Sequence, residues 1–77
     1  MSYRYILKIK GMRCGMCESH INSAIRNNFK IKKVKSSRHK EETVIESDEI
    51  LDEEKLIQVI KDTGYYYEGL NKEIKEQ

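Results

Sequence analysis

The spacing of apolar residues changes abruptly near the start of this 77-residue chain. In residues 3–10 apolar and polar side chains alternate, which predicts a strand with one buried face. The side chains expected on that face are Tyr5, Leu7 and Ile9. In residues 17–29 the apolar positions recur every three or four residues, which predicts an amphipathic helix. Gly11 ends the strand, and the only two cysteines of the chain, Cys14 and Cys17, occupy the transition to the helix.

Strand and helix patterns also alternate in the rest of the chain. Residues 30–37 and 42–47 predict two strands joined by a polar turn, and residues 65–67 begin a last short strand. Before that last strand, a second amphipathic helix begins at the expected N-cap Asp52 and ends at Gly64. Its apolar stripe consists of Leu56, Ile57, Val59 and Ile60. This order predicts an α+β fold, the ferredoxin-like βαββαβ sandwich with a four-stranded antiparallel sheet and two helices on one face.

The length of the chain allows one domain with a small hydrophobic core. We expect this domain to span residues 1–70 and residues 71–77 to form a charged C-terminal tail. No apolar run approaches the roughly 20 residues of a membrane-spanning helix, and no signal peptide precedes the first strand. We therefore expect a cytoplasmic protein without membrane insertion. The start at Met1 favours a free-standing protein, with an excised transporter domain as the alternative.

Charge is distributed unevenly along the chain. Residues 1–40 contain 11 of the 15 Lys and Arg residues and a single acid, Glu18, whereas residues 41–77 contain the other 12 acids. A nucleic-acid partner can produce such asymmetry, but lysines on an edge strand also protect a sheet from pairing with another chain. The expected third strand reads Glu-Thr-Val-Ile-Glu at residues 42–46, where RNA-recognition domains carry a basic-Gly-aromatic run. We expect no nucleic-acid partner, and keep an RNA-binding ferredoxin-like module as an alternative.

The cysteines form a Cys-x-x-Cys pair that spans the loop and the first helical turn. The positive end of the helix favours the thiolate form, above all at Cys17. Thiolates select soft ions, and two of them suffice for a monovalent d10 ion such as Cu(I), whereas zinc prefers four ligands. Arg13 would offset part of the negative charge of two thiolates around such an ion. Thioredoxin-type enzymes place a cis-proline opposite their thiols, and this chain has no proline, which argues against such an enzyme. Because the sequence also shows no set of nucleophile, base and orienting residue and no phosphate-binding glycine loop, we expect no enzyme activity.

The run Gly11-Met12-x-Cys14-x-x-Cys17 after the first strand resembles the signature of heavy-metal-associated domains. This family comprises small copper chaperones and N-terminal domains of metal-transporting P-type ATPases. The resemblance extends from about residue 6 to residue 65 and includes the Asp-Thr-Gly-Tyr turn at residues 62–65.

The resemblance implies a role for each matching residue. Cys14 and Cys17 would be the metal ligands, Met12 a buried support beneath the loop, and Tyr65 a residue packed beside the site. Copper-binding members often have threonine at the position of Arg13, and some zinc-handling domains have aspartate there. Since Arg13 supplies no third oxygen ligand, it argues against zinc.

His20 lies outside the signature, one helical turn beyond Cys17. It is either a solvent-facing helix residue or a third ligand whose imidazole turns toward the loop. Lys30 and Ile31 replace the Gly-Val with which family members usually enter the second strand, so we expect a different turn after the first helix.

The function implied by the resemblance is that of a Cu(I) metallochaperone, which transfers its ion by thiolate exchange. The acceptor would be a metal-transporting P-type ATPase or another thiol-bearing protein. The alternative is a carrier or detoxification domain for Hg(II), Ag(I) or Zn(II). We expect a monomer in the absence of metal, and a metal-bridged dimer is the alternative when metal is bound.

Overall fold

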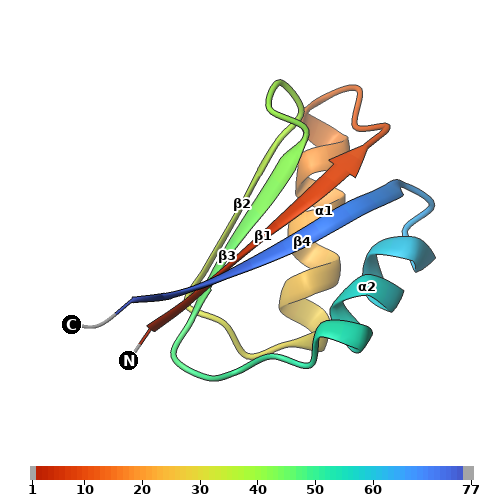
Figure 1. Ribbon diagram of the computed structural model, residues 1–77. Helices are drawn as coiled ribbons and strands as arrows, with labels where there is room; N and C mark the ends of the chain where they lie inside the picture. Colours follow the sequence, from red (N-terminus) through yellow and green to blue (C-terminus); the bar gives the residue numbers. More distant parts are fainter. Residues whose placement is uncertain (1, 76–77) are drawn as a thin grey trace.

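Six elements follow one another in the computed structural model, which describes residues 2–75 (Figure 1). They are β1 Ser2–Lys10, α1 Gly15–Asn28, β2 Lys33–Ser37, β3 Glu42–Ser47, α2 Glu53–Asp62 and β4 Tyr66–Lys75. The strands form one antiparallel sheet in the order β2-β3-β1-β4, and both helices lie on the same face of it. This arrangement confirms the predicted α+β, ferredoxin-like fold.

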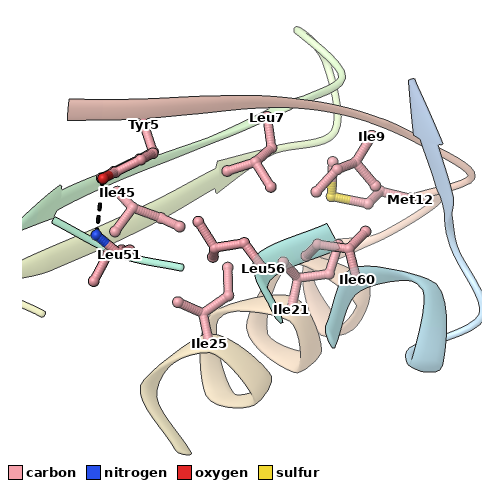
Figure 2. Packing of buried hydrophobic residues seen from close by; sticks show 10 residues of the cluster. All are labelled: Tyr5, Leu7, Ile9, Met12, Ile21, Ile25, Ile45, Leu51, Leu56 and Ile60. Carbon is pink, nitrogen blue, oxygen red and sulfur yellow. Dashed lines mark hydrogen bonds between the residues drawn. The ribbon is translucent and has the colours of Figure 1, made fainter. Parts of the chain in front are cut away.

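The hydrophobic core lies between the sheet and the two helices (Figure 2). The alternating apolar positions of β1 face the apolar stripes of α1 and α2, as the two periodicities predict. The fully buried apolar residues of these three elements are Tyr5, Leu7, Ile9, Ile21, Ile25, Leu56 and Ile60. Within the core, the Tyr5 hydroxyl accepts a hydrogen bond of 2.8 Å from the backbone N–H of Leu51. This bond pairs two polar groups that burial would otherwise leave unsatisfied.

The residue that caps each helix shows where that helix begins. Asp52 caps α2 as predicted, because its carboxylate accepts a hydrogen bond from the backbone N–H of Lys55. α1 begins at Gly15, two residues earlier than its apolar pattern indicates, with Cys14 in extended conformation as its N-cap. An apolar stripe marks only the buried face of a helix, so it does not reveal the exposed residues of the first turn. The earlier start places Cys17 within that first turn.

The predicted C-terminal tail is wrong for residues 71–75, because β4 continues through them to Lys75. β4 pairs with β1 from Lys10, opposite Tyr66, to Ser2, opposite Lys75. This pairing satisfies the backbone N–H and C=O groups of a segment whose charged side chains are typical of a tail. The guanidinium of Arg4 also lies 3.8 Å from the carboxylate of Glu73. Residues 76 and 77 of the predicted tail lie outside the described residues.

β2 is shorter than predicted and begins at Lys33 rather than at residue 30. Residues 29–32 connect it to α1, and within this connection the backbone N–H of Lys32 already donates to the carbonyl of Glu46 at 2.8 Å. β3 has the predicted bounds. Among residues 2–75, no helix has the length and apolar character needed to cross a membrane.

The fold brings three connections to one end of the sheet. The loop between β1 and α1 and the turn between β2 and β3 lie side by side there (Figure 1), and the backbone N–H of Ile9 donates to the carbonyl of Glu41 in that turn. The connection between α2 and β4 reaches the same loop, since a side chain at Gly11 would contact Tyr65 and Tyr66. The two cysteines are therefore held between segments from three parts of the chain.

Candidate metal centre

The loop that carries the cysteines is shaped by Gly11 and supported by Met12. Gly11 has a φ of +99°, a conformation that side chains disfavour, and a Cβ there would lie 3.4 Å from the Tyr66 ring. The following residue, Met12, turns inward, is 9% exposed and lies beside Ile9 at the end of the core (Figure 2). The loop thus leaves the sheet at a tight turn and is attached to the core directly before Arg13 and Cys14.

The two thiols lie close together at the N-terminus of α1. Their Sγ atoms are 3.8 Å apart, and both cysteines are free. The carbonyl of Cys14 accepts hydrogen bonds from the backbone N–H groups of Cys17 and Glu18, at 3.1 and 3.4 Å, which fixes the relative position of the two cysteines. Cys14 is exposed and Cys17 is half-buried. Because a metal–thiolate bond is about 2.3 Å long, one ion can contact both sulfurs at this separation.

Tyr65 lies beside the thiol pair, where the resemblance places it. A hydrogen bond from its side chain is the largest of the influences that lower the pKa of Cys17 from its ordinary value of 9.0 to about 7. The backbone of Arg13 and of Cys14 lowers this pKa further by hydrogen bonding. The same bond raises the pKa of Tyr65, since the Tyr65 phenol is the donor to the thiolate. A metal must displace the thiol proton, so a lower pKa reduces proton competition near neutral pH.

Replacing Tyr65 by phenylalanine removes this hydrogen bond and keeps the ring. We expect the pKa of Cys17 in Tyr65→Phe to rise from about 7 toward 9.0, so the thiolate fraction at neutral pH falls. The pH dependence of iodoacetamide alkylation, measured in a Cys14→Ser background with one reactive thiol, reports this pKa. Tyr66→Phe is the matched control, because Tyr66 is the exposed neighbour. An unchanged alkylation midpoint in Tyr65→Phe would contradict the assigned hydrogen bond.

The other predicted site residues lie around the thiol pair without completing a metal cage. Arg13 is exposed on the loop beside Cys14. The His20 ring packs edge-on against Tyr65, with ring centroids 6.0 Å apart. Across residues 2–75, no group of three or more His, Cys, Asp and Glu side chains is placed to hold one ion, so the structure does not bring His20 together with the thiols. A role for His20 as a third ligand stays a prediction.

One contact at this site was not predicted from the sequence. The carboxylate of Glu18, directly after Cys17, accepts hydrogen bonds from the backbone N–H of Arg38 at 2.7 Å and from its guanidinium at 3.2 Å. Glu18 is the single acid of residues 1–40, which was the only sequence signal for it. Its partner lies 20 residues away in the turn between β2 and β3, so no local pattern links the two residues.

Comparison with known proteins identifies the family of this domain. A family model described as the heavy-metal-associated domain matches residues 6–66. Comparison with curated protein sequences gave no significant match.

Three solved structures illustrate the likeness. A structure of the CopZ metallochaperone is 25% identical, with a TM-score of 0.76, over 83% of this chain and 97% of that one. The yeast copper transporter domain Ccc2a, solved in the apo and Cu(I)-loaded states, is 26% identical, with a TM-score of 0.74, over 84% and 90% of the two chains. The N-terminal domain of ZntA is 23% identical, with a TM-score of 0.76, over 96% of each chain, and it supports the fold alone. With the family model covering most of its length, this chain belongs to the heavy-metal-associated domain family.

Proposed function

We propose that this protein binds Cu(I) through Cys14 and Cys17 and transfers the ion to another thiol-bearing protein. The observation that carries the proposal is the pair of free thiols, 3.8 Å apart, on a loop at a helix N-terminus. Two sulfurs at this separation can hold one soft ion between them, and the helix N-terminus favours their thiolate forms. The exposure of Cys14 leaves the ion accessible to an incoming ligand.

The surroundings of the thiols favour a monovalent ion over zinc. No third His, Cys, Asp or Glu joins the two cysteines within the part of the chain that the structure describes. Two thiolates suit Cu(I), whereas zinc would need two further ligands. Two thiolates and one monovalent ion carry a net negative charge, which the neighbouring Arg13 partly offsets.

Transfer proceeds by ligand exchange between thiols. A thiol of the acceptor loses its proton, and the thiolate bonds to the Cu(I) held by Cys14 and Cys17. The resulting three-coordinate ion then breaks its bond to one of the original cysteines, which takes up a proton. A second exchange completes the transfer, and copper keeps its oxidation state throughout. An exposed site with few ligands keeps each exchange fast, because only one bond has to break at a time.

One structural neighbour supports a chaperone role, and another supports copper as the cargo and a transporter as the acceptor. One is a metallochaperone, and the other is a copper transporter domain that has been solved with Cu(I). We therefore propose a metal-transporting P-type ATPase as the acceptor class. Because transfer needs reduced thiols, we propose that the protein acts in a reducing compartment such as the cytoplasm, as a monomer when free of metal.

The alternatives concern the cargo and the partner. A carrier or detoxification domain for Hg(II), Ag(I) or Zn(II) would use the same two thiols. An RNA-binding role receives less support, because basic side chains on the open face of the sheet already pair with acids. Lys8 lies 3.2 Å from Glu42, and Arg4 lies 3.4 Å from Glu46. These pairs leave less free positive charge for phosphates.

An anaerobic titration with Cu(I) against a chromophoric chelator tests the proposal. We expect one equivalent of Cu(I) per chain, no displacement by equimolar Zn(II), and faster movement of copper to an apo thiol-bearing acceptor domain than to the chelator alone. Size-exclusion chromatography of the loaded protein separates a monomer from a metal-bridged dimer. Absence of stoichiometric Cu(I) binding, or displacement of Cu(I) by Zn(II), would overturn the assignment of copper as cargo.

A further inference from the structure

We infer that Arg38, in the turn between β2 and β3, is a positioning residue for the candidate metal centre and acts through Glu18. In this inference Arg38 holds the first turn of α1 against the sheet and neutralises the carboxylate that follows Cys17. The inference rests on the proposed function, because its effect is on the metal bound by the two thiols.

The contact between the two residues is specific and partly shielded from water. Both carboxylate oxygens of Glu18 are used, Oε2 by the backbone N–H of Arg38 at 2.7 Å and Oε1 by its Nη1 at 3.2 Å. The side chains are 21% exposed at Glu18 and 37% exposed at Arg38. Charge-assisted hydrogen bonds with two acceptor oxygens are stronger and more directional than a single exposed ion pair.

The pair also borders the residues between the cysteines. A Cβ placed on Gly15 would lie 4.0 Å from the Nη1 of Arg38 and 4.0 Å from the Oε1 of Glu18. In addition, the backbone N–H of Glu18 donates to the carbonyl of Cys14. The Glu18–Arg38 pair is therefore attached to the backbone that sets the separation of the two thiols.

The turn that carries Arg38 is itself anchored. The carbonyl of Glu41 accepts a hydrogen bond of 2.9 Å from the backbone N–H of Ile9, at the end of β1. The backbone N–H of Lys40 donates to the hydroxyl of Ser37 at 3.2 Å. Arg38 thus connects α1 to a turn that is bonded to the strand directly before the metal loop.

Charge gives the pair a second role. Two thiolates holding a monovalent ion carry a net negative charge, which an unpaired carboxylate at residue 18 would repel. Pairing with Arg38 reduces this repulsion at the residue that directly follows Cys17. Removing the guanidinium should therefore weaken metal binding only while residue 18 carries a negative charge.

A double-mutant cycle on the full chain tests this coupling through Cu(I) affinity, measured by chelator competition. We expect Arg38→Ala to weaken Cu(I) binding about fivefold, the size of a well-placed surface charge effect. In the Glu18→Gln background, the same substitution should change the affinity less than about twofold. Arg38→Lys, which keeps the charge, should recover most of the affinity. Lys32→Ala, which removes an exposed ion pair of 3.3 Å to Asp48 at the other end of β2, is the matched control.

The outcomes separate the two proposals. If the unmodified protein binds Cu(I) and Arg38→Ala has no effect, or an equal effect with Glu18 and with Gln at residue 18, the inference is wrong and the proposed function stands. If the unmodified protein does not bind Cu(I), both fail. Thermal unfolding of each metal-free variant identifies any loss of affinity that comes from unfolding rather than from charge.

Discussion

Replacing Cys14 and Cys17 together by serine is expected to abolish stoichiometric Cu(I) binding. Serine is similar in shape to cysteine but has no soft thiolate, which is the group that Cu(I) selects. The Cu(I) affinity should fall by more than about 100-fold. Losing a residue that only supports a metal ligand already costs up to about 100-fold, and here the ligands themselves are removed. Anaerobic chelator competition measures the loss.

Three further variants sharpen this experiment. The single variants Cys14→Ser and Cys17→Ser should each lose most of the affinity, because one thiolate cannot replace a chelating pair. Met16→Ala changes the 82% exposed residue between the cysteines and should leave Cu(I) affinity within about twofold of the unmodified protein. Stoichiometric Cu(I) binding that persists in the double variant would show that the ion is held elsewhere.

Replacing Leu56 by alanine is expected to destabilise the fold strongly. Leu56 is fully buried where α2 packs against β1 and α1 (Figure 2), so truncation removes apolar contacts and leaves a cavity. The free energy of unfolding should fall by about 3 kcal/mol, within the range for buried Leu-to-Ala substitutions. Urea unfolding of the metal-free protein under reducing conditions measures this difference.

A control on the surface makes the interpretation specific. Ile50 is 66% exposed, so Ile50→Ala should change the free energy of unfolding by less than about 0.5 kcal/mol. Equal effects at the two positions would contradict the assignment of Leu56 to the core. A loss of this size matters for a 77-residue domain, because small domains bury little surface and have little stability to lose.

The elements that the sequence predicts best are those with strong apolar patterns. β1 and α2 have a clear period and a clear start, and both are found within one or two residues of the prediction. β4 was underestimated, because residues 71–75 have mostly polar side chains and their strand conformation depends on backbone pairing with β1. A propensity read along the chain cannot include a hydrogen-bond partner about 70 residues away.

At the candidate metal centre, the sequence by itself determined the two thiols and the glycine that ends the strand, since these follow from residue type and spacing, while the buried Met12 was implied by the family resemblance. The resemblance also implied that Tyr65 lies beside the thiols, but only the tertiary structure decided how Tyr65 reaches Cys17 and that Arg38 joins Glu18 there. Tyr65 reaches Cys17 because α2 returns the chain to the end of β1, and Arg38 reaches Glu18 because the turn between β2 and β3 lies beside the same loop. The identity and spacing of neighbouring residues determine which metal ligands a loop can offer. The charges and hydrogen bonds around those ligands depend on packing between segments distant in the chain.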